Sequence, residues 1–182
     1  MILAALPEGQ SGATISVMLL DEGDSSGWVL KALRECANSV VSELSLLDDE
    51  TLCRAPADGD WCLKEIAAHL RDAEELSLRQ MTAIVENTGG TLPAWDIDLL
   101  PAERNYRSED LGDLLSQMIK LRRETTYLIW GLPGSEWRSS GDHPYRGRVT
   151  VETIARELAQ HDLEHLAEIR RLKHQLTKHD AA

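Results

Sequence analysis

Histidines on the apolar faces of two expected helices are the residues of this sequence best suited to chemistry. His161 and His165 form an HxxxH pair. Residues four apart lie on one face of a helix, so their imidazoles can converge on a single ion, as in helical zinc motifs. His69, in the run EIAAHLRDAEE, flanks the apolar stripe of an earlier helix and can supply a third ligand. This pattern predicts a three-histidine divalent-metal site that leaves coordination positions for water or substrate. The alternative is three core histidines, each satisfied by a hydrogen bond.

An acidic residue shares the apolar face with the HxxxH pair. When the last helix is projected at 100° per residue, Asp162 and His165 fall inside its apolar stripe and His161 falls at the edge. Burying such groups without partners is unfavourable, so a compensating group is expected. Arg122 lies on the apolar face of the preceding helix, and we expect it to pair with Asp162, which then orients a metal ligand. In the alternative, both side chains reach the surface.

Apolar residues recurring at helical spacing predict the elements that must position these side chains. The expected helices cover residues 25–47, 61–87, 109–130 and 151–176. Asp60, Ser108 and Thr150 are the expected N-caps of the last three. The core must be built from aliphatic residues because phenylalanine is absent, and Leu and Ala favour helices over sheets.

Four long amphipathic helices predict an all-α protein, a four-helix bundle. The connection 88–107 is long enough to run back along the bundle, so the second and third helices can be parallel. The segment 131–149 is rich in Gly and Pro and is expected to form an ordered loop at one end. Residues 1–24 are expected to be a loosely attached extension, and residues 25–182 the bundle domain.

Charge and cysteine content exclude several classes of function. The net charge of −12 repels phosphate backbones and anionic lipid surfaces, so neither nucleic acid nor membrane is an expected partner. No apolar stretch is long enough to cross a bilayer, and no signal peptide is evident. The three cysteines are an odd number without a CxxC pair, which favours free thiols in a reducing compartment. We therefore expect a cytoplasmic protein.

Two stretches of the sequence resemble a known family. The run GDHPYRGRVTVETIARELAQHDLEHLAEIRRL resembles the last helix and preceding loop of the DinB-like superfamily, especially its DinB_2 and YfiT-like branches. The run DWCLKEIAAHLRDAE resembles the second helix of the same family. The most specific feature is HDLEHL together with the upstream HL and the HPYRGRVT loop. The resemblance covers roughly residues 28–176.

The resemblance implies a bundle of up-down-down-up topology that binds a metal through one histidine of the second helix and two of the fourth. Those roles fall on His69, His161 and His165. It also implies a metal-dependent enzyme, either a hydrolase or a thiol-dependent S-transferase or isomerase, that forms a homodimer. The expected substrate is a small molecule, with a low-molecular-weight thiol as one candidate, and imidazole ligands suit zinc or nickel. The alternatives are a non-catalytic metal-binding stress-response protein and a purely structural dimeric bundle.

Three further residues stand near the predicted site. Glu168 follows His165 by one turn, at a position often held by Gln in related sequences; it can back a ligand or face solvent, and we favour solvent. His143, in the Gly/Pro-rich loop, is expected to make a loop-stabilising hydrogen bond, with an approach to the site as the alternative. Cys62, near the start of the second helix, is expected to be a small core residue and not a nucleophile. No separate general base is evident.

Overall fold

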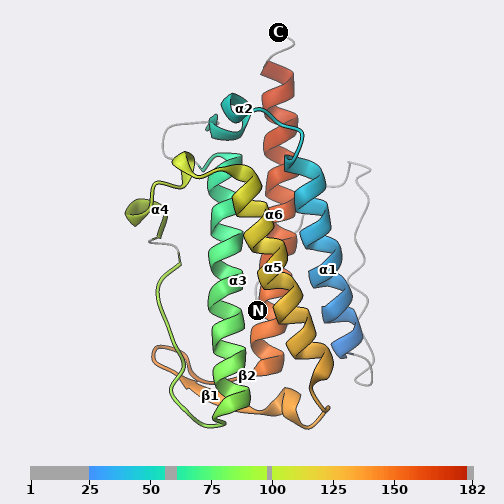
Figure 1. Ribbon diagram of the computed structural model, residues 1–182, viewed down its shortest axis with the longest axis vertical. Helices are drawn as coiled ribbons and strands as arrows, with labels where there is room; N and C mark the ends of the chain where they lie inside the picture. The colour runs from blue at the N-terminus through green and yellow to red at the C-terminus, as the bar shows by residue number, and fades with distance from the viewer. Residues whose placement is uncertain (1–24, 56–60, 98–99, 180–182) are drawn as a thin grey trace, which may run out of the picture.

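Four long helices dominate the computed structural model, which describes residues 25–55, 61–97 and 100–179 (Figure 1). They are α1 (Ser25–Leu44), α3 (Leu63–Glu86), α5 (Leu111–Gly131) and α6 (Val151–His179). The predicted extension 1–24 lies outside the described residues. No helix in the described part of the chain is both long and apolar enough to cross a bilayer.

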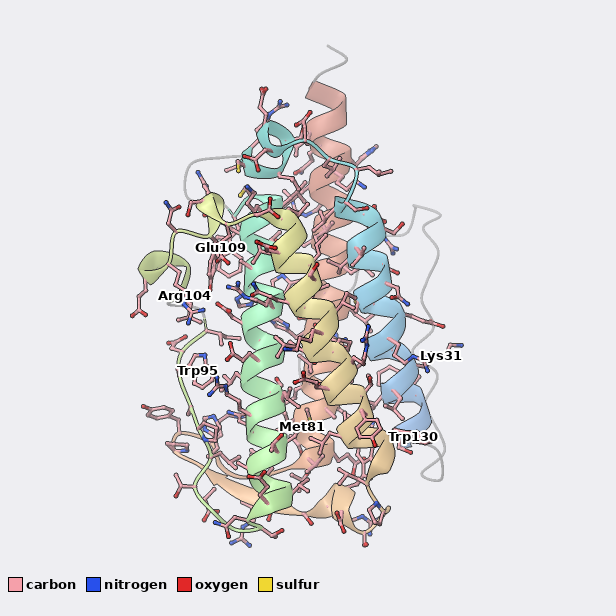
Figure 2. All side chains as sticks on the ribbon, in the orientation of Figure 1. Lys31, Met81, Trp95, Arg104, Glu109 and Trp130 are labelled. Atoms are coloured by element: carbon pink, nitrogen blue, oxygen red, sulfur yellow. The ribbon has the colours of Figure 1, made fainter. Side chains whose placement is uncertain are left out.

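The helices form a bundle in which α1 and α6 run in one direction and α3 and α5 in the other (Figure 1). Helix α1 packs against both α5 and α6, and α3 packs against both α5 and α6. The predicted up-down-down-up topology is therefore confirmed, including the parallel arrangement of the second and third helices. The connection that makes it possible contains the short helix α4 (Leu100–Glu103) and a 3₁₀ helix at Tyr106–Ser108. Figure 2 shows Trp95 and Arg104 of this connection beside the outer side of α3.

The helix ends differ from the prediction in ways that local hydrogen bonds explain. Helix α3 begins at Leu63 with Cys62 as its N-cap, where Glu65 accepts a hydrogen bond from the Cys62 backbone N–H at 2.8 Å; Asp60, the predicted cap, lies outside the described residues. The prediction of Ser108 as the cap of α5 was wrong. The Ser108 hydroxyl donates to the Asn105 carbonyl, and Asp110 caps α5 instead.

The cap predicted for the last helix is confirmed. Thr150 Oγ1 accepts from the backbone N–H of Thr153 at 3.1 Å. Helix α1, in contrast, ends at Leu44 and not at residue 47. The chain then turns, with Leu46 fully in solvent, and forms the short helix α2 (Asp49–Cys53).

The Gly/Pro-rich segment before α6 contains structure that the sequence did not predict. Strands β1 (Ser140–His143) and β2 (Gly147–Thr150) form an antiparallel hairpin after a 3₁₀ helix at Glu136–Arg138. The loop after α3 is held against β1, because Leu92 N–H donates to Asp142 O and Asp142 N–H donates to Gly90 O. Gly141 is required by this approach, since a Cβ there would lie 2.4 Å from the Leu92 side chain. The hairpin is thereby fixed beside the end of α3.

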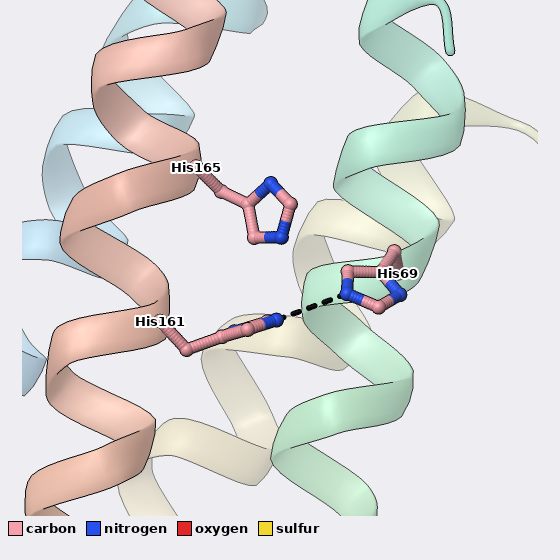
Figure 3. Close-up of side chains that lie close together, drawn as sticks. All are labelled: His69, His161 and His165. Atoms are coloured by element: carbon pink, nitrogen blue, oxygen red, sulfur yellow. Dashed lines mark hydrogen bonds between the residues drawn. The ribbon is translucent and has the colours of Figure 1, made fainter. Parts of the chain in front are cut away.

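The bundle interior is divided along its length by a polar layer. One apolar cluster fills the end nearest the C-terminus of α6, and a second fills the end nearest the hairpin, where Figure 2 shows Met81 on α3. Between the two clusters lie the buried polar side chains of Glu74, Arg122, Thr125 and Asp162. His69, His161 and His165 lie where α3 faces α6 (Figure 3), and His161 Nδ1 is 3.9 Å from Asp162 Oδ1 of this layer.

Candidate metal centre

The three predicted ligands come together between α3 and α6 (Figure 3). One ring nitrogen from each of His69, His161 and His165 lies within 4.8 Å of those of the other two. His69 Nε2 is 2.9 Å from His161 Nε2, and the ring centroids of the two α6 histidines are 4.5 Å apart. The prediction that these imidazoles share one centre is thus confirmed by the geometry. Neutral imidazole is a preferred ligand of divalent transition metals, so this cluster can hold such an ion.

Burial favours the neutral form of His69 and His165, the form that metal ligation requires. His69 is only 2% exposed. Loss of hydration, followed by the proximity of His161 and then His165, lowers the pKa of His69 from 6.5 to about 4. Burial and the proximity of His161 lower the pKa of His165 as well. At neutral pH these two rings therefore keep their nitrogen lone pairs available.

The carboxylate of Glu168 fixes the orientation of one ligand. It lies 2.9 Å from His165 Nδ1, so the Nδ1–H donates to Glu168 and Nε2 is left as the atom with a free lone pair. Our expectation that Glu168 faces solvent was wrong. Side chains three apart on a helix are neighbours, and this one turns back onto the imidazole. Glu168 therefore contacts His165 in the way that carboxylates contact metal-binding histidines.

The Glu168 contact gives a first prediction. Glu168→Ala should weaken zinc binding by about 10–100-fold, because the acceptor that orients His165 is lost. The change is measured by competition with a chromogenic chelator. Glu164→Ala is the matched control, since this residue lies on the exposed side of α6 and contacts Gln160 instead. Equal zinc affinities for the parent and Glu168→Ala would show that Glu168 does not contribute to metal binding.

The predicted pairing of Asp162 with Arg122 is confirmed. Arg122 Nη2 lies 2.5 Å from Asp162 Oδ2, and both side chains are buried. The guanidinium also bonds the carboxylate of Glu74 through Nε at 2.8 Å and the Leu33 carbonyl through Nη1 at 2.6 Å. The network therefore joins all four long helices, and it leaves Asp162 Oδ1 facing the site.

Asp162 lies close to the second ligand of α6 without bonding it. Asp162 Oδ1 is 3.9 Å from His161 Nδ1, and neither atom has a hydrogen-bond partner among the described residues. Two Nε2 atoms at 2.9 Å are closer than two ligands on one tetrahedral ion of ordinary Zn–N length, about 2.0–2.1 Å. If an ion were held by both rings, Asp162 Oδ1 would be the acceptor nearest to the Nδ1–H of His161, at 3.9 Å in the present arrangement.

Two residues of the site were missed by the sequence analysis. Glu74 is fully buried, and its position in the apolar stripe of α3, four residues after Leu70, is the same signal that identified Asp162. Burial is the largest influence on Glu74 and raises the pKa of its carboxyl. The ring centroid of Trp61 is 4.7 Å from that of His69, and the Trp61 ring is stacked on His165 with 6.3 Å between the centroids. It closes one side of the histidine cluster.

The two remaining candidates behave as predicted. His143 Nδ1 accepts a hydrogen bond from the Tyr145 backbone N–H at 3.2 Å, which is a contact within the hairpin turn. Its ring also lines a groove that reaches His161. Cys62 is fully buried, and burial raises the pKa of its thiol, so it is not an activated nucleophile. All three cysteines are free thiols.

An up-down-down-up helical bundle with three convergent imidazoles between two helices defines a class of candidate metalloprotein. The chain belongs to the DinB superfamily, whose family model matches residues 32–169. A candidate metal-dependent hydrolase of Oceanobacillus iheyensis is 22% identical over 143 residues, covering 78% of this chain and 81% of the relative.

Solved structures share the fold. YfiT from Bacillus subtilis, described as a probable metal-dependent hydrolase with an unusual four-helix bundle topology, superposes with a TM-score of 0.78 at 16% identity and covers 94% of both chains. The four-helix bundle protein TT2238 superposes with a TM-score of 0.60 at 16% identity, covering 80% of this chain and 98% of its own. The family and the histidine cluster together support a metal-dependent function.

Proposed function

We propose that this protein is a metal-dependent hydrolase whose ion is held by His69, His161 and His165. The observation that carries the proposal is the convergence of three imidazole nitrogens within 4.8 Å of one another. A divalent ion on three neutral ligands supplies a Lewis acid that polarises a carbonyl and makes water nucleophilic near neutral pH. Zinc and nickel are the ions we propose, because imidazole suits both.

The surrounding residues have distinct tasks in this proposal. Glu168 and Asp162 orient the imidazoles of His165 and His161 through their Nδ1 atoms. Trp61 covers one side of the cluster, so substrate enters from the other side, where a groove reaches His161. In the overall reaction, the water oxygen bonds to the acyl carbon, the bond from that carbon to oxygen or nitrogen breaks, and the leaving group takes the proton.

Metal content tests the ligand assignment. Elemental analysis of the purified protein should find about one ion per chain. His69→Ala, His161→Ala and His165→Ala should each lose it, while His174→Ala, on the exposed side of α6, should keep it. Near-ultraviolet circular dichroism of every variant separates loss of the ion from loss of the fold. If the three ligand variants bind as much metal as the parent, the assignment fails.

Activity tests the reaction class. The parent should hydrolyse members of a panel of small p-nitrophenyl esters and anilides, lose that activity on chelation, and regain it with added zinc or nickel. Transfer to low-molecular-weight thiols, without hydrolysis, would favour the S-transferase or isomerase alternative that the family resemblance raised. If the protein catalyses neither reaction in the presence of metal, it is a non-catalytic metal-binding protein.

We further propose that the protein is a cytoplasmic homodimer. Light scattering measures its molar mass in solution and so tests the dimer.

A further inference from the structure

A groove leads from the histidine cluster to the β-hairpin. It lies between α3 and α6, has a volume of about 180 Å³, and is lined by His161 together with His143 and Arg146 of the hairpin. This volume is smaller than the ~300–1,000 Å³ of sites for drug-sized ligands, so the groove suits a small organic molecule. Because His161 is one of its walls, a molecule lying in it would reach the proposed metal centre.

The walls of the groove are apolar in the middle and polar at the hairpin end. Leu76, Ile154 and Leu158 supply aliphatic surface from the two facing helices. The charged side chains that line it are Arg146 and Glu157, which form an ion pair with 2.5 Å between Arg146 Nη2 and Glu157 Oε1. About half of each side chain is exposed, so the pair remains accessible from the groove.

Two hydrogen-bond donors of the hairpin turn are available to a ligand. His143 Nδ1 accepts from the Tyr145 N–H, so in the neutral ring the proton is on Nε2, which acts as a donor. Arg146 uses Nη2 for Glu157, while a guanidinium carries five N–H donors in a planar fork that matches a carboxylate. A planar anion is therefore the group that this end of the groove recognises best.

We propose that the groove binds the carboxylate of a small acylated acid, held by Arg146 and His143, with the acyl group directed toward His161. The aliphatic middle of the groove accommodates the chain that joins the two groups. This proposal rests on the proposed hydrolase function and adds a preference, among its substrates, for esters or amides that carry a free carboxylate. Glu157 competes with the ligand for Arg146 and so weakens the binding of anions.

Butyrate and its uncharged analogue butyramide are the probes for the subsite. Binding to the full-length protein is followed by ¹H–¹⁵N NMR, with zinc and after chelation, because a carboxylate can also bind the ion directly. In the chelated protein, butyrate should shift the amide signals of the hairpin and the first turns of α6, and butyramide should not. Arg146→Gln should raise the dissociation constant for butyrate about tenfold or more, since a charge-assisted bidentate contact is lost.

Two further variants make the test specific. Glu157→Gln should tighten butyrate binding, because the competing carboxylate is gone. Arg148→Gln is the matched control: this side chain is 73% exposed on the same hairpin, pairs with Asp142, and does not line the groove. It should leave the dissociation constant unchanged. Equal binding of butyramide, or an Arg146→Gln variant that binds butyrate like the parent, overturns the proposal.

Failure of this inference is distinguishable from failure of the proposed function. Zinc content and chelation-sensitive hydrolysis of uncharged esters test the proposed function by themselves, and both persist if only the carboxylate subsite is wrong. Conversely, the His161→Ala variant should lose zinc, and in the presence of chelator the same variant should still bind butyrate at the hairpin. In the active enzyme, Arg146→Gln should raise KM for esters that carry a carboxylate more than it raises KM for neutral esters.

Discussion

Replacing Arg122 with methionine should lower the free energy of unfolding by about 3–5 kcal/mol. Arg122 is the one cation between the carboxylates of Glu74 and Asp162 in the polar layer that the structure describes, and all three side chains are buried. Methionine keeps most of the volume but leaves two carboxylates in an apolar interior without a compensating charge. The Leu33 carbonyl also loses its donor. Urea denaturation of the chelated protein measures the change.

Arg123→Met is the matched control for this prediction. Its side chain is exposed on the adjacent position of α5, so the free energy of unfolding should stay within about 0.5 kcal/mol of the parent value. Adding Glu74→Gln and Asp162→Asn to Arg122→Met should recover part of the loss, because the uncompensated charges are gone. A single Arg122→Met variant as stable as the parent would mean that the network is not a source of stability.

The polar layer also explains why the candidate metal centre lies in the middle of the bundle. The same level of α6 carries His161 and His165 toward α3 and Asp162 toward α5. Arg122 holds Asp162 from one side, so the carboxylate is fixed before any ion arrives. Preorganised groups behind the ligands reduce the rearrangement needed when the ion binds. Burying the Arg122–Asp162 ion pair costs free energy, and the pair lies where it can also orient the histidines.

Helical periodicity was sufficient to predict the bundle and the convergence of the histidines. Residues four apart on one helix must share a face, and an ionisable group inside an apolar stripe must find a partner. These two rules predicted the HxxxH pair and the contact between Asp162 and Arg122. The same rules also indicate Glu74 on α3, because it lies four residues after Leu70 in the apolar stripe of that helix.

The features that were missed depend on contacts between distant parts of the chain. The strands of the hairpin have four residues each and place only Gly141 and Val149 in the interior, so no apolar alternation reveals them. Their position is set by the loop after α3, through Leu92 and its bonds to β1. The position of Trp61 beside the histidines could not be predicted either, because its contact with His165 joins residues more than one hundred positions apart. Periodicity within an element carries no information of this kind.

The metal-free protein should become less stable as the pH falls from 6.5 toward 4, with His69 as a main cause. Burial, His161 and His165 lower the pKa of His69 to about 4 in the folded state, whereas the unfolded chain has the ordinary value near 6.5. Between these values the unfolded chain binds a proton that the folded state does not, so protonation favours unfolding. The stabilisation is complete above the unfolded pKa and is lost as the pH falls to the folded one.

The size of this effect follows from the separation of the two pKa values. One pKa unit corresponds to about 1.4 kcal/mol, so His69 contributes on the order of 3 kcal/mol across the window. His165, whose pKa is also lowered, adds to it with the same sign. Glu74 acts in the opposite sense, because its raised pKa favours the folded state at low pH.

The difference between the parent and His69→Gln isolates the histidine, since both proteins retain Glu74 and His165. Urea denaturation in the presence of chelator at pH 7.0, 6.0 and 5.0 should give a steep loss for the parent and a shallower one for the variant. With saturating zinc the parent should be more stable at pH 7 by mass action, and its pH dependence should be steeper because protons compete with the ion for the same nitrogens. Parallel stability curves for the chelated parent and His69→Gln would show that the buried imidazole does not titrate as its surroundings require.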